Sequence, residues 1–380
     1  MSTEVRDFSQ RSYYPGTTGN PFDRILHRFA SVQTLPAPVF ALALAVLAAL
    51  VTLATFPRFL ILLAFFLLDW ALLARLPAAG RSYGPPRPPV LILAALRSLF
   101  AWLPISWMLA VQGLGTALAT YGFWIEPMRI RLTRETLVSP KLKPGTSFRL
   151  LHLGDLHVER FTRREEQLIA LIRETNPDLI LFSGDVLNLS YLHDARALAD
   201  ARQVLSQWQA SCGAFAVSGS PAVDLEELLP QVYAGLPVRL LRNQRVTVTV
   251  DGNTIDLIGI DCSHKPFVDA PILDRLVPQP PENFSLLLYH SPDLSPNAAH
   301  AGIDLHLAGH THGGQVRLPF IGPIYTASLY GRQFQSGRYA LKNLTLYITR
   351  GIGLEGGAAP RVRFFCPPEI ILWEVQSTTP

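Results

Sequence analysis

The chain has 380 residues, of which 49% are hydrophobic and only 16% are charged, and its formal net charge is +4. A charged fraction well below the ~25% of soluble proteins indicates that part of the chain is not surrounded by water. The small net charge and the lack of a basic stripe argue against nucleic acid as a partner. Three cysteines, Cys212, Cys262 and Cys366, have neither a zinc-ligand nor a disulfide spacing.

The apolar residues are concentrated in the first third of the chain. Residues 36–56 carry no charge, residues 59–74 contain Asp69 as their only acid, and residues 98–124 are again uncharged. About 20 apolar residues are needed to cross a bilayer, and helices buried in a soluble core are usually shorter and amphipathic. The runs therefore predict an integral membrane protein with about three transmembrane helices.

This reading divides the chain into four parts. Residues 1–35 form a polar N-terminal segment, residues 36–124 the membrane region, residues 125–146 a connector, and residues 147–380 an α/β domain. A further segment, residues 90–104, is compatible with a fourth short span or an interfacial helix.

The side of the membrane is read from arginines in the flanking loops. Three spans would place the two chain ends on opposite faces. Arginines before the first span and between the second and third favour a cytoplasmic N-terminus, with the C-terminal domain outside a bacterial cell membrane. The arginines that follow the third span argue for the reverse, as would a fourth span. The two groups are Arg6, Arg11, Arg24, Arg28, Arg75, Arg81, Arg87 and Arg97, against Arg129, Arg131 and Arg134.

From residue 148 onward, apolar strand patterns alternate with helical ones. Thr162 and Glu165 form a capping box before an amphipathic helix, and a second helical stripe runs over Leu198–Trp208. The early strands are continuous apolar runs, which is typical of strands buried on both faces. The expected strands are residues 148–155, 178–185, 213–220, 244–250, 254–261, 284–290, 303–310, 344–351 and 369–375.

Metal-ligating residue types follow several of these strands directly. An open α/β sheet builds its sites at the carboxyl ends of its strands, so these side chains are expected to meet. Any one of them alone is also compatible with a turn or helix-capping residue. Together they predict a shared metal site, formed by Asp155, His157, Asp185, His290, His310 and His312.

The motifs GDLH (154–157), GDVLN (184–188), YHSPD (289–293) and GHTHGGQ (309–315) resemble the calcineurin-like metallophosphoesterase family. The resemblance extends over about residues 147–375. It includes a bacterial membrane-anchored branch with phosphodiesterases and UDP-2,3-diacylglucosamine pyrophosphatase-like enzymes. It implies an α/β/β/α sandwich of two sheets between helices, behind the N-terminal transmembrane helices.

The resemblance also implies two divalent cations. Asp155, His157 and His312 would hold the first, His290 and His310 the second, and Asp185 would bridge them. Such a pair, ~3.5–4 Å apart, activates water and binds phosphoryl oxygens, and imidazole with carboxylate suits Mn, Fe, Zn or Co. The implied activity is hydrolysis of phosphodiester or pyrophosphate bonds in phosphate-containing small molecules or lipid-linked envelope substrates.

One family motif, Gly-Asn-His followed by an acid, is missing. Gly219 is followed by Ser220 in the place of the metal-binding Asn and by Pro221 in the place of the His. A serine hydroxyl is a shorter and weaker ligand, so the second cation is expected to bind loosely. Two readings remain: a hydrolase without a general acid, whose loss slows catalysis ~10²–10⁴-fold, and a metal-binding membrane sensor or scaffold with little or no turnover.

Other classes fit the sequence less well. A transporter usually carries more intramembrane charge than the single Asp69, and a membrane-tethered chain without a basic stripe is a poor soluble nuclease. Arg160 and Arg350 lie near the motifs and are candidates for binding phosphate, or else structural arginines.

Overall fold

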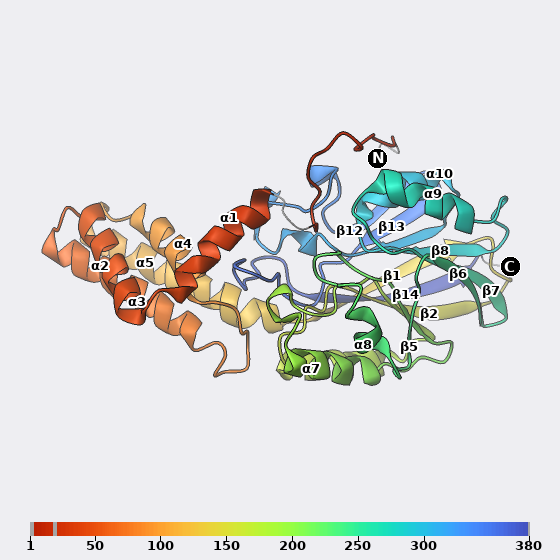
Figure 1. The fold of residues 1–380 in the computed structure, drawn as a ribbon, viewed down its shortest axis with the longest axis horizontal. Helices are drawn as coiled ribbons and strands as arrows, with labels where there is room; N and C mark the ends of the chain where they lie inside the picture. Colours follow the sequence, from red (N-terminus) through yellow and green to blue (C-terminus); the bar gives the residue numbers. More distant parts are fainter. Residues whose placement is uncertain (1–3, 18–20, 379–380) are drawn as a thin grey trace.

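The structure, a computed structural model, describes residues 4–17 and 21–378. It consists of an α/β sandwich with a bundle of helices projecting from one end (Figure 1). Each of the expected strands is present, and two six-stranded sheets form the centre of the sandwich. The fold thus agrees with the predicted two-sheet α/β arrangement.

The first sheet has the order β1-β14-β2-β3-β4-β5, and its three strands β2, β3 and β4 are parallel to one another. β14 is antiparallel to β2 and parallel to β1. β1 lies within the predicted connector, yet it pairs along its whole length with β14, so this part of the connector belongs to the sheet. The strands are β1 (Arg131–Ser139), β2 (Ser147–Leu153), β3 (Leu179–Phe182), β4 (Ala214–Ala216), β5 (Val238–Leu240) and β14 (Glu369–Ser377).

The second sheet has the order β12-β13-β9-β8-β7-β6. β6 and β7 form the predicted hairpin, where Asp251 and Gly252 both adopt positive φ, as a two-residue type I′ turn requires. The remaining short strands pair as a small separate hairpin, β10 (Arg317–Leu318) and β11 (Gly322–Pro323). The strands of the second sheet are β6 (Gln244–Val250), β7 (Asn253–Gly259), β8 (Phe284–Leu288), β9 (Leu305–Ala308), β12 (Gly337–Leu341) and β13 (Leu344–Ile348).

Helices cover the outer face of each sheet, and buried apolar side chains fill the layer between the sheets. α6 begins with the predicted capping box, in which Thr162 and Glu165 satisfy backbone amides reciprocally. The first sheet carries α6 (Arg163–Thr175), α7 (Ala195–Ser206) and α8 (Leu229–Tyr233), and the second carries α9 (Pro266–Leu276) and α10 (Ser295–His300). The layers are therefore α/β/β/α.

The helical bundle comprises α1 (Pro21–Ala30), α2 (Ala37–Val51), α3 (Phe56–Ala74), α4 (Arg87–Ser98) and α5 (Ile105–Thr120). Two helical runs are long and apolar enough to cross a membrane: α3, and the continuous run Ile105–Met128 that starts with α5. α2 would make a third only if it formed one span with residues 28–34, from which it is bent by 117°. The segment proposed as a fourth span or interfacial helix is α4, which is 12 residues long.

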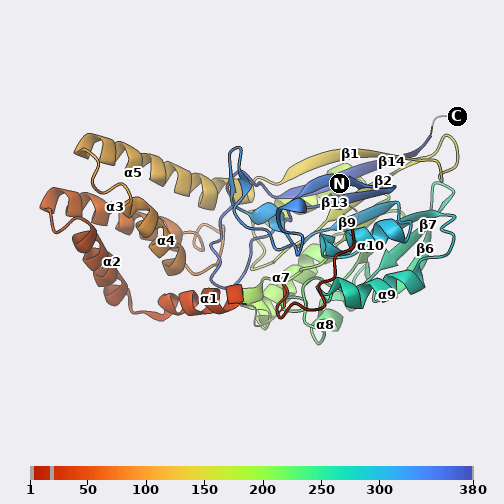
Figure 2. The same cartoon turned by 90° about the horizontal axis from the view of Figure 1, so that it is seen from above.

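In the bundle, α3 packs against α2, α4 and α5, and the α2–α3 and α4–α5 turns lie at the end away from the sandwich (Figure 2). The tips at these turns, residues 51–56 and 99–104, touch far from the sandwich, where the Trp102 indole donates to the Val51 carbonyl at 3.0 Å. Inside the bundle, Arg97 forms a two-pronged ion pair with Asp69, with N–O distances of 2.6 and 2.7 Å. The only acid of the apolar runs is therefore neutralised by an arginine that the sequence placed in a loop.

A segment that precedes the bundle packs on the sandwich. Residues 4–17, called here the N-terminal arm, bury Phe8 and Tyr14 in the core of the second sheet and its helices. The Phe8 ring meets Tyr330 edge to face, with centroids 5.1 Å apart, and the Tyr14 hydroxyl donates to the Phe8 carbonyl. Segments on both sides of the bundle therefore meet in the sandwich.

Candidate metal centre

The predicted ligands lie at one edge, where strands of both sheets end. Asp155 and His157 follow β2, and Asp185 follows β3 in the neighbouring parallel position. His290 follows β8, and His310 and His312 follow β9. All six side chains are buried, and His310 is the most accessible of them at 6%. The structure thus brings together every residue of the expected cluster.

The backbone at these positions adopts an uncommon conformation. Asp155, His157, Asp185, His310 and His312 all have φ between +42° and +70°, the left-handed region that favours glycine. Such residues are strained by about 1–3 kcal/mol each and cluster at functional sites. This backbone conformation directs each side chain away from the strand and toward the common centre.

The Asp185 carboxylate occupies the middle of the cluster. Its Oδ2 lies 3.5 Å from His157 Nε2 and 3.3 Å from His290 Nε2, so one oxygen faces a histidine from each sheet. Asp155 Oδ1 lies 3.9 Å from His312 Nε2 and 3.9 Å from His290 Nδ1. Asp185 is therefore the carboxylate that lies between a histidine of each sheet.

The donor set fits divalent cations. The Nε2 atoms of His157 and His312 approach to 3.0 Å, and Nδ1 of both rings and Oδ2 of Asp155 are buried without a partner among the described residues. Buried polar atoms are normally satisfied, so converging lone pairs of this kind indicate a cation site. Three groups have mutually close ligand atoms: Asp155–His157–His312, Asp155–Asp185–His290 and His264–His290–His310.

Hydrogen bonds to backbone carbonyls orient two of the histidines. His290 Nδ1 bonds to the Ser183 carbonyl at 2.7 Å, and His310 Nε2 bonds to the Ala327 carbonyl at 3.1 Å. Each ring thus donates from one nitrogen and keeps a lone pair on the other, as second-shell partners of metal ligands do. Burial lowers the pKa of His310 to about 3, which keeps this imidazole neutral.

Charge in the centre is balanced between Asp185 and its histidines. Burial alone would raise the pKa of Asp185, but His290 and His157 outweigh this effect and hold that pKa below its usual value. Burial raises the pKa of Asp155 to about 6, although His290 opposes the shift. Two carboxylates this close and this deeply buried call for positive charge between them, which cations would supply.

Ser220 lies at the centre, and the loop that carries it is braced by a carboxylate. The Ser220 amide donates to Asp185 Oδ1 at 2.7 Å, and its hydroxyl oxygen lies 3.1 Å from His290 Nε2. Asp224 accepts from the amides of Gly219, Asp185 and Val186, so it fastens the two loops together. Asp224 is therefore a structural brace rather than a replacement ligand.

Two residues at the centre were not predicted from the sequence. His264 follows β7 by five positions, is 1% exposed, and groups with His290 and His310. Glu355 lies at the rim, with Oε2 3.7 Å from His312 Nε2 and 35% of its side chain exposed. The signal for His264 was available, since it follows a strand end as His290 and His310 do.

The two arginines considered for phosphate binding already have acidic partners. Arg160 Nη2 lies 2.7 Å from Asp194 Oδ2 and stacks over the Tyr191 ring, and Arg350 pairs with Glu369. Both arginines are thus used in fixing loops around the centre.

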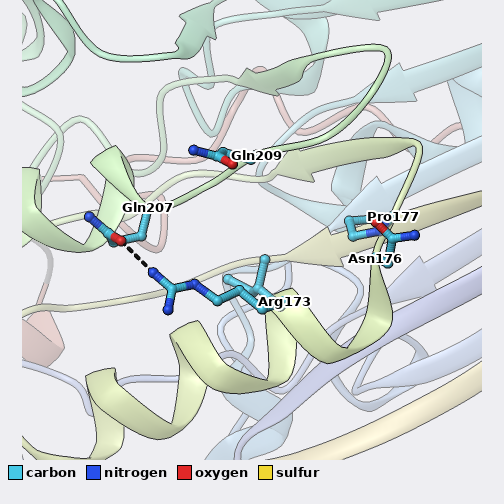
Figure 3. Close-up of a pocket in the computed structure, with 6 residues that line it drawn as sticks. Arg173, Asn176, Pro177, Gln207 and Gln209 are labelled. Carbon is cyan, nitrogen blue, oxygen red and sulfur yellow. Dashed lines mark hydrogen bonds between the residues drawn. The ribbon is translucent and has the colours of Figure 1, made fainter.

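A separate pocket lies at the opposite edge of the first sheet (Figure 3). Its lining includes Asn176 and Pro177, which precede β3, and Gln207 and Gln209, which precede β4. In it, Arg173 donates to the Gln207 side chain at 2.6 Å. The metal-ligand cluster follows the carboxyl ends of these strands, so this pocket is not part of it.

Comparison with known proteins agrees with the geometry. The sequence profile of the calcineurin-like phosphoesterases matches residues 148–314. The metallophosphoesterase YkuE of Bacillus subtilis is 29% identical, and the match covers 74% of this chain and 96% of YkuE. Phosphodiesterase YaeI of Escherichia coli is 28% identical, and the match covers 67% of this chain and 92% of YaeI. The UDP-2,3-diacylglucosamine pyrophosphatase LpxG of Chlamydia muridarum is 23% identical, and the match covers 65% of this chain and 90% of LpxG. Residues 148–314, which carry most of the cluster, thus match the calcineurin-like phosphoesterase family.

Proposed function

We propose that this protein is a membrane-anchored, metal-dependent phosphoesterase that hydrolyses phosphodiester or pyrophosphate bonds of lipid-linked or envelope substrates. The observation that carries the proposal is that the strand ends bearing the metal-ligand cluster lie at the end of the sandwich where β1 leaves the apolar helical bundle, and Figure 2 shows the bundle projecting from one end. A substrate held in a membrane would therefore meet the centre at the end of the domain nearest to that membrane.

The strand directions show which end of the first sheet faces the helical bundle. β1 begins directly after the helical run that ends at Met128, and Arg131 at its start pairs with Glu369. The end of β2 lies beside the same stretch, because His152 pairs with Ile371. The carboxyl end of β2, which leads into Asp155, therefore faces the bundle.

Direct contacts join the cluster to the bundle. Glu159, two positions beyond His157, accepts from the Tyr83 amide at 2.8 Å and from the Ser82 hydroxyl at 3.2 Å. The same carboxylate pairs with Arg361 at 2.8 Å, and both side chains are buried. The α3–α4 loop is thus fixed to the segments that follow the ligands.

Divalent cations, when bound, would polarise a phosphoryl group and supply a nucleophilic water at neutral pH. Asp155, His157 and His312 are positioned to hold one cation, His290 and His310 the other, and Asp185 to contact both. Glu355 is the exposed acid beside this set, so it is placed to exchange protons with solvent. Pro221 has no proton to give to a leaving group, which favours substrates whose leaving groups need little protonation.

An apolar surface beside the centre is suited to a lipid. Residues 317–325, called here the apolar hairpin, follow His312 closely and expose the large side chains Phe320, Ile321 and Ile324, of which Phe320 is fully exposed. The hairpin is joined to Phe364, whose ring meets Tyr121 at the end of α5 with centroids 5.9 Å apart. This surface therefore continues the apolar surface of the bundle, and its exposure in water would be unfavourable.

The bundle itself has the surface of a membrane anchor. Its outward side chains are apolar around most of its circumference, which is uncommon in a protein dissolved in water. The large exposed ones include Leu42, Leu50, Leu53, Phe56, Leu60, Leu96, Leu99, Trp102, Trp107 and Leu114.

The N-terminal arm and the sandwich must lie on the same side of the membrane, because they pack together. The chain then crosses an even number of times or turns back within the bilayer, rather than crossing three times. Most arginines that flank the apolar helices lie on the sandwich side, while the tip end of the bundle carries one, Arg58, which donates to the Ala101 and Leu103 carbonyls, so the positive-inside rule favours a cytoplasmic domain. This reverses the side favoured by the sequence. The arginines are Arg6, Arg11, Arg24, Arg28, Arg75, Arg81, Arg87, Arg129, Arg131 and Arg134.

Topology reporters test this arrangement. Reporters fused to the N-terminus and to the C-terminus of the full chain should both give a cytoplasmic signal. An extracytoplasmic signal from the C-terminal fusion would contradict the proposed side, and opposite signals from the two ends would contradict the packing of the arm.

A second candidate function is a metal-binding membrane sensor or scaffold with little or no turnover. The observation that favours it is the replacement of the family's Asn and His by Ser220 and Pro221, both of which lie in the loop at the centre. Loss of two groups from the catalytic set would leave binding intact and reduce hydrolysis.

One assay separates the two functions. The purified full chain in detergent, loaded with Mn²⁺ or Co²⁺, should hydrolyse aryl phosphodiesters and nucleotide-lipid pyrophosphates and leave alkyl monoesters nearly untouched. Phe320→Asp should lower the rate on a lipid pyrophosphate in mixed micelles and leave a soluble aryl diester unaffected. Metal binding without hydrolysis of any of these substrates would favour the sensor.

A further inference from the structure

We propose that His264 is a ligand of the second cation and takes the place of the family's missing asparagine. This inference rests on the metal-dependent function proposed above and adds a residue that lies outside the motifs of the resemblance. His264 comes from the loop after β7, a part of the chain distinct from the loop that carries Ser220. A ligand lost from one loop would thus be replaced from another.

The His264 imidazole occupies the space beside the short serine. Its Nε2 lies 3.0 Å from Ser220 Oγ, and the same hydroxyl lies 3.1 Å from His290 Nε2. The ring centroids of His264 and His310 are 4.2 Å apart, and those of His264 and His290 are 5.8 Å apart. A ligand atom of each of the three histidines lies within 4.8 Å of the others, as a shared cation requires.

The backbone of His264 also resembles that of the other ligands. Its φ is +59°, in the same left-handed region as Asp155, Asp185 and His310. Strain of this kind persists where the surroundings hold a side chain in a functional position. Gly16 of the N-terminal arm lies against the ring, since a Cβ added there would come within 2.3 Å of His264 Nε2.

A purely structural role explains these features less well. Nδ1 of His264 is buried without a partner among the described residues, which would cost about 1–3 kcal/mol in a core histidine. His306 provides the contrast, because it is equally buried and its two nitrogens contact Ser295 Oγ at 2.9 Å and the Tyr289 carbonyl at 3.4 Å. His152 is a second buried histidine whose Nδ1 has no partner among the described residues, but it belongs to none of the groups of mutually close ligand atoms, whereas His264 groups with His290 and His310.

The proposal changes the character of the second site. With His264, the second cation would have three imidazoles and the Asp185 carboxylate, against two imidazoles and two carboxylates at the first. The second site would then bind as a full four-ligand site, contrary to the loose binding expected from Ser220 alone. A nitrogen-rich set favours Zn, Co or Fe over Mg or Ca.

Titration of the metal-free full chain with Co²⁺ tests the proposal, with affinity from calorimetry and coordination from visible absorption. The unmodified protein should bind two equivalents. His264→Ala should leave the affinity of the first Co²⁺ site unchanged and weaken the affinity of the second. The loss should be at least the roughly 10–100-fold seen when the hydrogen-bonding partner of a metal ligand is removed. His264→Ala with Ser220→Asn should restore the second site, because it restores the family's own ligand.

His300→Ala, a change at an exposed histidine of the same domain, is the matched control and should bind like the unmodified protein. If His264→Ala does not fold, His264→Phe fills the same space without a ligand atom and should show the same loss. Two unchanged affinities in the folded variant, or a single equivalent in the unmodified protein, would overturn the proposal. The titration measures metal binding and needs no turnover. If the protein is inactive but His264→Ala loses its second Co²⁺, the proposed function is refuted and the ligand role of His264 is supported.

Discussion

Replacing Asp69 by leucine should destabilise the helical bundle more than any other single change at its centre. The Arg97 guanidinium donates to Asp69 twice, at 2.6 and 2.7 Å, to the Gln112 carbonyl at 2.7 Å and to Thr116 Oγ1 at 2.9 Å. Among the described residues, Asp69 is its only charged partner, and the pair is almost completely buried, at 5% and 0% exposure. Removing one partner of a buried pair leaves an uncompensated charge and costs about 3–5 kcal/mol.

The double change Asp69→Leu with Arg97→Leu is the informative comparison. It removes both charges, and replacing a buried pair by apolar residues is often neutral or stabilising by about 1–4 kcal/mol. Unfolding of the purified chain in detergent, followed by helical circular dichroism, should rank the double variant near the unmodified protein and Asp69→Leu far below it. Unchanged metal content in both variants would show that the sandwich is intact. Equal losses in the single and double variants would refute the reasoning, since the pair would then stabilise by its attraction.

Three further outcomes are expected at the metal centre. Asp185→Asn should reduce bound metal more than His157→Ala or His290→Ala, because only Asp185 faces both sites; equal, full occupancy in all three would contradict a shared ligand. Chelation should lower the melting temperature of the sandwich by roughly 5–10 °C, since ligand at 100 times its Kd contributes about 2.7 kcal/mol; an unchanged melting temperature would exclude tight binding. Gly16→Ala should loosen the N-terminal arm and speed hydrogen exchange at its amides, whereas Gly80→Ala, also at positive φ but with open space around it, should not.

Sequence reasoning located the metal-ligand cluster because the signal was local. Each expected ligand follows an apolar run that is buried on both faces, as β3 and β8 are along their whole length. In a parallel sheet, strand ends necessarily meet at one edge, so residues far apart in the chain could be grouped without knowing the packing. His264 obeys the same rule and was missed because no family motif pointed to it.

Three edge strands of the two large sheets, β1, β5 and β12, were not recognised, whereas the edge strand β6 was found from its alternation and the turn that follows it. β1 alternates between charged and apolar residues and lies at the sheet edge, where many of its side chains reach solvent. β5 and β12 are similarly short or partly exposed edge strands. Hydrophobic runs identify central strands, whereas edge strands are specified by the backbone of their neighbours, which one sequence segment does not reveal.

Topology depended on long-range packing for the same reason. Charge counting treated residues 1–35 as a loop on one side of the membrane, but burial of Phe8 and Tyr14 in the second sheet's core fixes this segment to the sandwich. Arg97 is a second example, because charge counting placed it in a flanking loop, whereas in the structure it is the buried partner of Asp69. Neither contact has a signature in local composition.

The arm, the bundle and the metal centre therefore depend on one another. The arm places Gly16 against His264, the α3–α4 loop binds Glu159 beyond His157, and the apolar hairpin leaves the chain just after His312. The ligands themselves are almost fully buried, and Glu355 is the accessible group beside them. Access to the proposed centre is thus restricted to a rim bordered by the exposed apolar side chains of the apolar hairpin. A water-soluble phosphate ester gains nothing from such a rim, whereas a phosphate carried on a lipid could keep its apolar part in the membrane while its headgroup reaches the cations.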